Sequence, residues 1–419
     1  MKRYVFLMTF SLISLTGMSQ TMTIHRTDGT LFTIWSDSIR NAKFFPTNFG
    51  IVTKDDEDLG CEYVDLDCIT FSTKEESPVY FLPEKEYTST DFSKDGQITV
   101  LQKHERGKGI PLVILGDAFS DRMINLGFFD KYAKAAMEAF FAREPFTTFR
   151  DYFDVYSVTV VSPKEVTSEE TTFGLGLDNS FTEAGDQKLQ DYVLSIPELN
   201  GSLKDVTAIM ISNMSPEFSG SYHSWLGEDN FNVAQTTLTL RKNYFAFNDY
   251  LVWHECGGHC FGLLADERVN NDASEVYPDE DHQYLDEQHS EGGSFNIDYH
   301  DTPETIWWKD FIANPDYQVE QIGLYEGALY SFAKSIYRPS DTSIMYASGE
   351  KSYYNAPSRW AIYQRIMKLA GEEYKFEDFL EYDKKNLEAI KALNAQSRSA
   401  STRTSVSQKS QINCRVVRK

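Results

Sequence analysis

The sequence predicts an α+β protein of 419 residues, in which a β-rich N-terminal region precedes a region of alternating strands and helices. Residues 21–105 contain alternating apolar and polar runs separated by turn residues, which is the pattern of antiparallel strands. From residue 110 onward, short apolar runs alternate with helical patterns. The hydrophobic fraction of 41% is that of a globular protein, and the chain is long enough for more than one core.

The first nineteen residues have the pattern of a secretory signal. Lys2 and Arg3 are followed by the apolar run "YVFLMTFSLISL" (4–15), and "GMS" (17–19) supplies small residues at the cleavage site. Residues 1–19 are therefore predicted to be a signal peptide, and the mature protein to be secreted, periplasmic or exposed at the cell surface. No later run approaches ~18 consecutive apolar residues, so no transmembrane segment is expected.

Residues 20–106 are predicted to fold as a small β-sandwich. The segment "TMTIHRTDGTLFTIW" (21–35) contains two alternating runs on either side of Asp28 and Gly29, which indicates a hairpin. The polar segment "KHERGKG" (103–109) marks the end of this domain.

Two further segments of this domain also read as strands. "CEYVDLDCITF" (61–71) alternates like one strand, so Cys61 and Cys68 are expected to lie roughly 23 Å apart, too far for a disulfide. "QITVLQK" (97–103) continues the β pattern.

Residues 107–394 are predicted to form a second domain with an α/β alternation. Strands are expected at 110–117, 153–161, 206–212 and 231–240, and helices at 124–144, 186–196 and 356–394. The apolar run 110–117 is typical of a buried strand. The acidic stretch 266–293 reads as a functional or ion-binding loop, with a solvated negative loop as the alternative. The tail 395–419 has six basic residues, no acidic residue and many serines, so it is predicted to be disordered.

The segment "HECGGHCFG" (254–262) contains two histidines, His254 and His259, at a spacing of five residues. In a regular α-helix five residues turn through ~500°, so the two imidazoles would point about 140° apart and would not share a metal ion. A single wider i→i+5 turn would align them, and such turns cluster at functional sites. Gly257 and Gly258 lie between the histidines and permit this distortion. The pattern therefore predicts a metal-binding helix.

Glu255 follows the first histidine directly, as in zinc peptidases that have an HExxH helix. Two neutral histidines suit Zn²⁺, which leaves a position for water and lowers the pKa of that water toward ~7. Glu255 is expected to take the proton of the water and to pass it to the leaving amine, without binding the metal. Cys256 and Cys260 are expected to be small packing residues of the helix rather than ligands.

A catalytic zinc ion needs a third protein ligand. Asp266, which follows the helix, is the predicted third ligand, and Glu267 beside it is the nearest competitor. A carboxylate that only forms a salt bridge at the end of the helix is the structural alternative. The more distant alternatives are histidines in or after the acidic stretch, namely His282, His289 and His300.

A second motif follows further along the chain. "TSIMYASG" (342–349) has the order serine, aliphatic residue, methionine, aromatic residue and small residues, which is typical of a Met-turn, the apolar floor beneath the metal of metzincins. Tyr346 in this segment is a candidate catalytic residue that donates a hydrogen bond to the oxyanion, with Tyr353 and Tyr354 as alternatives.

Together these segments make the chain resemble the bacterial immunoglobulin-A-peptidase family of zinc metallopeptidases, which is metzincin-like. The resemblance covers roughly residues 110–371. It is carried by "PLVILGDAFS" (111–120), "FRDYFDVYSVTVVSP" (149–163), "HECGGHCFGLLADE" (254–267) and "SIMYASG" (343–349). The resemblance implies a metzincin-like fold and a zinc endopeptidase, with His254 and His259 as ligands and Glu255 as catalytic base. The histidine spacing and the aspartate at 266 depart from the general metzincin motif.

The net charge of −23 opposes binding to nucleic acid, so the expected partner is a protein or glycoprotein substrate, and the sequence carries no sign of an oligomeric state. Two other functions stay open. One is a zinc exopeptidase of the dipeptidyl-peptidase type, a family that also spaces its zinc histidines five apart. The other is a non-catalytic surface-binding protein with a degenerate metal site, against which the intact Glu255 argues.

Overall fold

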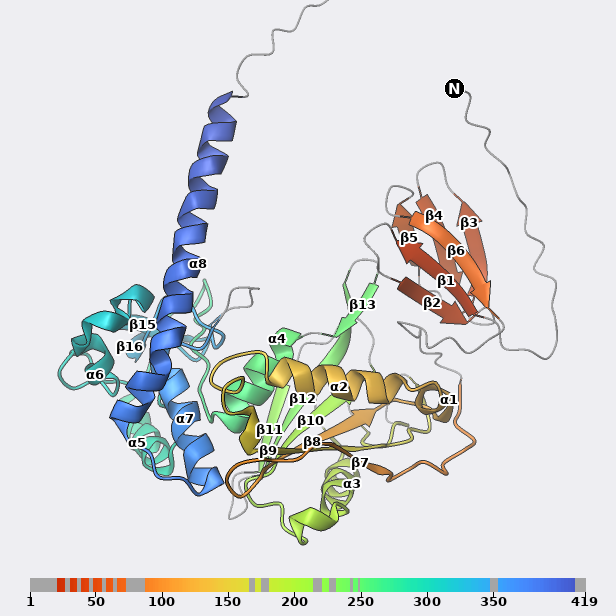
Figure 1. The fold of residues 1–419 in the computed structure, drawn as a ribbon, viewed down its shortest axis with the longest axis horizontal. Coiled ribbons are helices and arrows are strands. Elements are labelled where there is room, and N and C mark those ends of the chain that lie inside the picture. Colours follow the sequence, from red (N-terminus) through yellow and green to blue (C-terminus); the bar gives the residue numbers. More distant parts are fainter. Residues whose placement is uncertain are drawn as a thin grey trace, which may run out of the picture.

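The computed structural model describes residues 21–26, 31–35, 39–44, 48–54, 58–62, 66–72, 87–165, 170–174, 181–213, 221–225, 231–241, 244–247, 249–346 and 353–410. These ranges contain both helices and several β-sheets, so the predicted α+β class is confirmed (Figure 1). The predicted signal peptide (1–19) lies outside the described residues.

The N-terminal β region consists of two three-stranded antiparallel sheets with the orders β2-β1-β6 and β3-β4-β5. Their strands are β1 (Thr21–Arg26), β2 (Leu31–Trp35), β3 (Ile39–Phe44), β4 (Asn48–Thr53), β5 (Asp58–Glu62) and β6 (Leu66–Ser72). The predicted hairpin over 21–35 is confirmed, because β1 and β2 pair antiparallel. Buried side chains of both sheets form one apolar cluster, which contains Met22, Ile24, Ile34, Phe49 and Ile51.

The prediction of one continuous strand over 61–71 is wrong. β5 ends at Glu62 and β6 begins at Leu66, so Cys61 and Cys68 belong to different sheets. The alternation of apolar and polar residues runs through the junction without a break. It therefore does not reveal that the chain changes sheet there.

The second region is built around a seven-stranded sheet with the order β11-β12-β10-β8-β9-β7, in which β13 also pairs with β12. The four central strands β12, β10, β8 and β9 are parallel, and β7, β11 and β13 add antiparallel pairs at the edges. The strands are β7 (Ile98–Gln102), β8 (Ile110–Asp117), β9 (Phe153–Val158), β10 (Thr207–Ser212), β11 (Ser221–Trp225), β12 (Phe231–Arg241) and β13 (Tyr244–Phe247). All four central strands were predicted from the sequence.

The central strand β8 is buried on both faces of the sheet. Leu112 and Ile114 belong to one apolar core, and Val113 and Leu115 belong to the other. The helices that contribute to these cores are α1 (Asp121–Asn125), α2 (Phe128–Phe140) and α3 (Glu183–Leu194), with α1 and α2 on the first core and α3 on the second. The nearly continuous apolar run of β8 is thus explained by cover on both sides.

Strand β7 does not belong to the N-terminal β region in which it was predicted. It pairs antiparallel with β9 at the edge of the large sheet. The chain before it is attached to the same region, since the backbone N–H groups of Thr90 and Asp91 each donate to Asp121 Oδ2 at 2.8 Å. An edge strand of one sheet has the same alternating pattern as a strand of another, so the sequence pattern does not distinguish the two.

The C-terminal region adds a small sheet of order β14-β16-β15 and four helices. These elements are β14 (Glu275–Val276), α5 (His282–Glu291), α6 (Lys309–Ala313), β15 (Tyr325–Ala328), β16 (Phe332–Arg338), α7 (Ala356–Ala370) and α8 (Phe376–Ser410). The helical pattern over 356–394 is confirmed. Part of the acidic stretch 266–293, predicted as a loop, is instead formed by β14 and α5.

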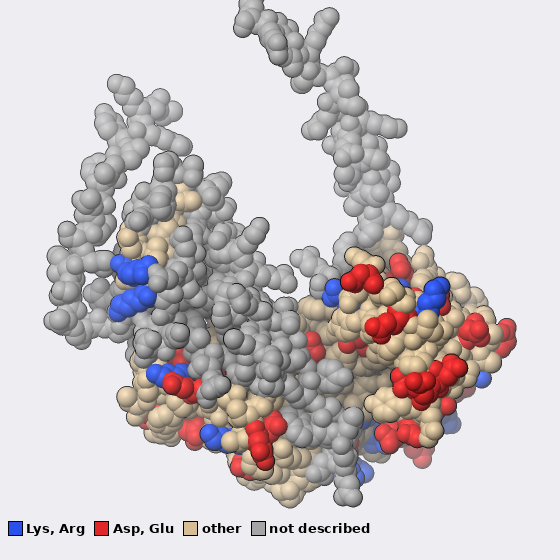
Figure 2. Space-filling view, turned by 180° about the vertical axis from the view of Figure 1, so that it is seen from behind, with Lys and Arg blue, Asp and Glu red and all other residues tan. Residues whose placement is uncertain are grey.

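Helix α8 extends through Ser410 into the tail 395–419 that was predicted to be disordered, and residues 411–419 lie outside the described residues. The segment 395–410 contains neither glycine nor proline, the residues that most strongly end a helix. In the described part of the chain, no helix combines the length and the apolar character needed to cross a membrane. Figure 2 shows acidic side chains spread over the described surface, in keeping with the net charge of −23.

Asp117, at the carboxyl end of β8, gives the fold a pH dependence. Its carboxyl group is fully buried, and burial raises its pKa from 3.8 to about 6 in spite of a hydrogen bond from Thr171 Oγ1. Protonated Asp117 therefore contributes stability that is complete below pH 3.8 and is lost as the pH rises through about 6. The full span corresponds to ~3 kcal/mol.

We expect Asp117→Asn to remove this dependence. We compare the unfolding free energy of the variant with that of the wild type at each pH. This difference should favour the variant by about 1 kcal/mol more at pH 7.5 than at pH 5, because only the folded wild type loses the Asp117 proton in that interval. Denaturant unfolding at both pH values measures the difference. An equal effect of the substitution at both pH values would show that Asp117 does not titrate in this range.

Candidate metal centre

The two histidines lie on a ten-residue π-helix, Val252–Phe261, which follows the short helix α4 (Asp249–Leu251). In a π-helix the hydrogen bonds run from i to i+5, so residues five apart lie on one face. We predicted a single turn of this kind, and the structure extends it over the whole segment. His254 and His259 consequently face each other, with ring centroids 4.8 Å apart.

His254, His259 and Asp266 converge in space. The Nε2 atoms of the two histidines are 3.3 Å apart. Asp266 Oδ1 lies 3.2 Å from His254 Nε2, and Asp266 Oδ2 lies 3.4 Å from His259 Nε2. These residues form a possible metal-binding group, with one donor atom from each within 4.8 Å of the others.

The spacing of these atoms fits a zinc ion. Donor atoms at ~2.0–2.1 Å from a tetrahedral zinc ion are separated from one another by roughly 3.3 Å, which matches the shortest distances within the group. Two imidazoles and one carboxylate are also a donor set of catalytic zinc sites, which keep the fourth position open. All three side chains are largely or fully buried, so little solvent competes for the position between them.

Backbone carbonyl groups fix the tautomers of both histidines. His254 Nδ1 lies 2.9 Å from the carbonyl oxygen of Ile344, and His259 Nδ1 lies 2.7 Å from that of Leu264. A carbonyl oxygen only accepts hydrogen bonds, so each Nδ1 must carry the proton. In the neutral imidazole the lone pair is then on Nε2, the atom that faces the other members of the group.

The charges of the group are coupled. Burial disfavours the protonated form of His254, but the hydrogen bond to Asp266 and the charges of Glu255 and Asp266 outweigh burial and raise the pKa of His254. Burial also acts to raise the pKa of Asp266, yet hydrogen bonds from His254 and His259 hold it well below its usual value. The carboxylate is therefore ionised, and a divalent cation that binds here displaces a proton shared with the histidines.

Glu255 lies beside the group, nearly buried on the π-helix at 8% exposure. Burial raises the pKa of its carboxyl group, and the nearby histidines His259 and His254 counteract part of that effect. Among the described residues, none forms a hydrogen bond to this carboxylate, and it is not part of the possible metal-binding group. A carboxylate with a raised pKa next to a metal site suits proton transfer near neutral pH.

Glu267, the alternative third ligand, is turned away from the histidines. Its carboxylate is completely buried and accepts hydrogen bonds from Ser343 Oγ, Asn296 Nδ2 and Asn355 Nδ2 at 2.7–3.1 Å. Its backbone N–H donates to the carbonyl oxygen of Met345. Glu267 thus ties the segment that carries Asp266 to the predicted Met-turn.

The three distant histidines are engaged elsewhere. His282 stacks on Tyr299 at 3.8 Å, and His300 Nδ1 lies 2.8 Å from Asp298 Oδ1. His289 Nε2 lies 3.1 Å from the carbonyl oxygens of residues 294 and 297. None of these histidines belongs to the metal-binding group found among the described residues.

The start of the predicted Met-turn packs directly beneath the π-helix. Met345 is fully buried, and a side chain at Gly258 would collide with its Sδ atom. A side chain at Gly257 would likewise collide with the hydroxyl of Tyr354, which donates to the carbonyl oxygen of Trp253. The paired glycines were predicted to permit the helix distortion, and close packing also requires them. Residues 347–349 lie outside the described residues.

The π-helix ends without a left-handed glycine. Gly262 has a right-handed φ of −75°, and the next residue, Leu263, is left-handed with a φ of 51°. A side chain at Gly262 would approach the carbonyl oxygens of Gly258 and Gly257 to within 3 Å. Glycine is therefore required there by close approach of the backbone.

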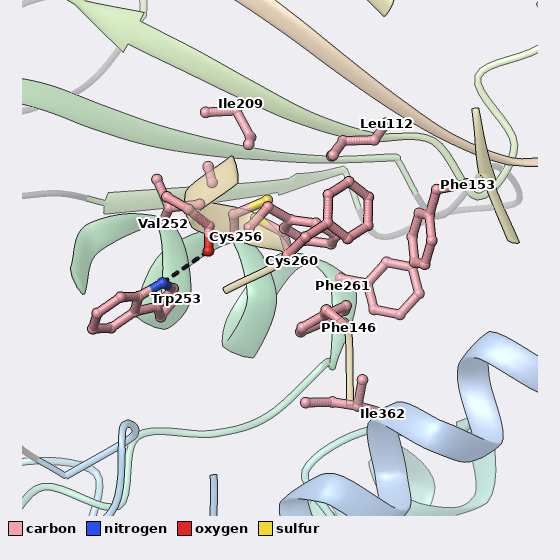
Figure 3. Close-up of a cluster of buried hydrophobic side chains, with 14 of the residues drawn as sticks. Leu112, Phe146, Phe153, Ile209, Val252, Trp253, Cys256, Cys260, Phe261 and Ile362 are labelled. Carbon is pink, nitrogen blue, oxygen red and sulfur yellow. Dashed lines mark hydrogen bonds between the residues drawn. The ribbon is translucent and has the colours of Figure 1, made fainter. Parts of the chain in front are cut away.

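The cysteines of the π-helix serve as packing residues, as predicted. Cys256 and Cys260 are free thiols without exposed surface, and burial raises the pKa of both well above the usual value. Figure 3 shows both side chains on the side of the helix that faces Leu112 and Ile209 of the sheet. Phe261 packs against Phe146 and Phe153, aromatic residues that also lie in this core. The apolar face of the helix thus anchors it, and the opposite face carries the histidines.

The predicted Tyr346 and Tyr354 contact residues outside the metal-binding group. Tyr346 is half-buried and its ring contacts the Arg338 guanidinium, 4.8 Å from the ring centroid. Tyr354 lies on the side of the helix that faces Gly257 and Phe146. Neither forms a hydrogen bond to the metal-binding group among the described residues.

Two other tyrosines, which the sequence reasoning missed, reach the group. The Tyr250 hydroxyl donates to the carbonyl oxygen of Ile344 at 3.0 Å and lies 3.2 Å from His254 Nδ1. The Tyr330 hydroxyl donates to Asp266 Oδ1 at 3.1 Å. Tyr250 precedes His254 by four residues, a helical spacing that gives a usable signal, whereas nothing in the sequence around Tyr330 connects it with the site.

No protein-family model matches the chain, and no curated protein matches it in sequence. The case for a function therefore depends on the geometry of His254, His259, Asp266 and Glu255.

Proposed function

We propose that the protein is a zinc-dependent endopeptidase that hydrolyses peptide bonds in proteins or glycoproteins. The observation that carries this proposal is the convergence of His254 Nε2, His259 Nε2 and the Asp266 carboxylate at separations of 3.2–3.4 Å, next to Glu255. Zinc held by these three residues supplies a Lewis acid for the scissile carbonyl group and makes water acidic near neutral pH.

The residues of the chain then have distinct roles. His254 and His259 present their Nε2 lone pairs because Ile344 and Leu264 hold the opposite nitrogens. Glu255 accepts a proton from the attacking water and returns it to the leaving amine, for which its raised pKa is suited. The buried Met345 closes the floor of the site.

The resemblance to the immunoglobulin-A-peptidase family supports the same proposal. It implies a metzincin-like fold for the second region, with 342–349 as its Met-turn. For the N-terminal region we propose a β-sandwich, which is consistent with two sheets that share one apolar cluster. The predicted signal peptide supports export of the protein to the exterior or the periplasm.

The test is to load the purified protein with zinc and to incubate it with unfolded proteins and with peptides blocked at both ends. We expect about one zinc per chain, internal cleavage of the blocked peptides, and loss of cleavage with a chelator. Removal of dipeptides from free N-termini, without internal cleavage, would indicate an exopeptidase instead. Failure to bind zinc at neutral pH would favour a binding protein and refute the proposal.

A further inference from the structure

Tyr330 lies beside the metal-binding group although 64 positions of sequence separate it from Asp266. Its hydroxyl donates to Asp266 Oδ1 at 3.1 Å, and the same oxygen lies 3.2 Å from His254 Nε2. The side chain is nevertheless 40% exposed. Tyr330 thus combines contact with a proposed ligand and access from solvent.

The backbone holds Tyr330 firmly over the ligand segment. The N–H of Leu329 donates to the carbonyl oxygen of Asp266 at 3.0 Å, and the N–H of Tyr330 donates to that of Arg268 at 2.7 Å. The carbonyl oxygen of Tyr330 in turn accepts from the N–H of Asn270 at 2.9 Å. These three bonds fix the backbone of Tyr330 relative to that of Asp266, and the hydroxyl then reaches Oδ1.

This placement has an energetic cost. Leu329 and Tyr330 have φ values of 53° and 63°, so two consecutive residues other than glycine are left-handed. Each costs of order 1 kcal/mol, and such strain is retained mainly at functional sites, where the surrounding structure enforces it. The Arg268 guanidinium lies 5.8 Å from the centre of the Tyr330 ring and supports it from one side.

The other tyrosines of the site contact groups other than the Nε2 and carboxylate atoms that would hold the metal. The Tyr250 hydroxyl bonds to the carbonyl oxygen of Ile344 and lies against the Nδ1 side of His254, which faces away from the Nε2 atoms. Tyr346 contacts Arg338. Among the described tyrosines, Tyr330 is the one whose hydroxyl bonds to the carboxylate of the metal-binding group.

We propose that Tyr330 is a catalytic residue of the endopeptidase, whose hydroxyl donates a hydrogen bond to the oxyanion that develops on the scissile carbonyl. This inference rests on the proposed function. When the oxygen of water bonds to the carbonyl carbon, the electron pair of the C=O double bond moves to its oxygen, and Glu255 takes the proton of the water. The Tyr330 O–H, which donates to Asp266 Oδ1 before the reaction, turns to that carbonyl oxygen, stays protonated and stabilises it. The C–N bond then breaks, and the proton on Glu255 passes to the leaving amine.

The test compares Tyr330→Phe with the control Tyr284→Phe, at an exposed position of α5. We expect Tyr330→Phe to lower kcat by ~10²–10³-fold, the usual effect of losing one donor to an oxyanion, with little change in KM. Its affinity for a phosphinic peptide, which mimics the tetrahedral state, should fall by a similar factor. Its zinc dissociation constant, measured by chelator competition, should rise by no more than the ~10–100-fold that loss of a hydrogen bond to a ligand costs, and the loss of kcat should persist at saturating zinc. Tyr284→Phe should behave like the wild type.

Three results would overturn this role. Cleavage by Tyr330→Phe at the wild-type rate would show that the hydroxyl does not act in the reaction. A weakened zinc affinity, with kcat restored at saturating zinc, would make Tyr330 a positioning residue for Asp266 instead. A zinc-loaded wild type that cleaves no peptide would refute the proposed function itself, an outcome that is seen before any variant is made.

Discussion

Glu255→Gln is expected to lower kcat/KM for peptide cleavage by about 10³-fold while the protein keeps its zinc and its stability. Glutamine has the same shape but accepts no proton, so only the transfer from water to the leaving amine is lost. The carboxylate lies outside the metal-binding group and accepts no hydrogen bond from the described residues, so its replacement should leave the fold intact. Cleavage assays on zinc-loaded protein, with metal analysis and thermal unfolding, measure the three effects separately.

The matched control is Glu275→Gln, which removes one carboxylate from the exposed strand β14 and should leave cleavage unchanged. Undiminished cleavage by Glu255→Gln would remove Glu255 from the mechanism. Loss of zinc from this variant would contradict the role as well, because it would make Glu255 a ligand or a support of the ligands.

Asp266→Ala is expected to raise the zinc dissociation constant by more than about 100-fold and to abolish cleavage at ordinary zinc concentrations. Replacing a residue that only supports a ligand typically costs 10–100-fold in affinity, and the loss of a ligand should exceed that range. The variant also leaves His254 Nε2 and His259 Nε2 without the carboxylate that lies 3.2–3.4 Å from them. Chelator competition at neutral pH gives the constants.

Glu267→Gln is the matched control for the choice between the two neighbouring carboxylates. Its buried carboxylate accepts from three side chains, and an amide matches those donors poorly, so we expect a loss of ~1–3 kcal/mol in unfolding free energy. Zinc should still bind to the folded variant. If Glu267→Gln lost zinc and Asp266→Ala kept it, the third ligand would be Glu267.

The sequence predicted the central part of the site because its signals are local. The five-residue spacing of His254 and His259 is incompatible with one face of an α-helix, and the structure resolves the conflict with a π-helix. Asp266 lies close enough in sequence for the end of that helix to return it to the histidines. The apolar run 110–117 likewise predicted a buried strand, and β8 is covered on both faces.

The sequence did not predict contacts that depend on distant pairing. Tyr330 reaches Asp266 because the backbone of 329–330 bonds to that of 266–270, and no local pattern records such pairing. Two predictions failed for the same reason, namely one continuous strand over 61–71 and the assignment of β7 to the N-terminal β region. Period-2 alternation is identical whichever sheet a strand joins. Glu267 and Asp266 are adjacent carboxylates, and only the positions of Ser343, Asn296 and Asn355 separate their roles.

The most direct test is the position of zinc in a crystal of the zinc-loaded protein, located by its anomalous scattering. We expect one strong peak at ~2.0–2.2 Å from His254 Nε2, His259 Nε2 and an Asp266 oxygen, with Glu255 near but unbound. A π-helix whose histidines bind no metal, or a zinc ion held by other residues, would contradict the assignment of this site.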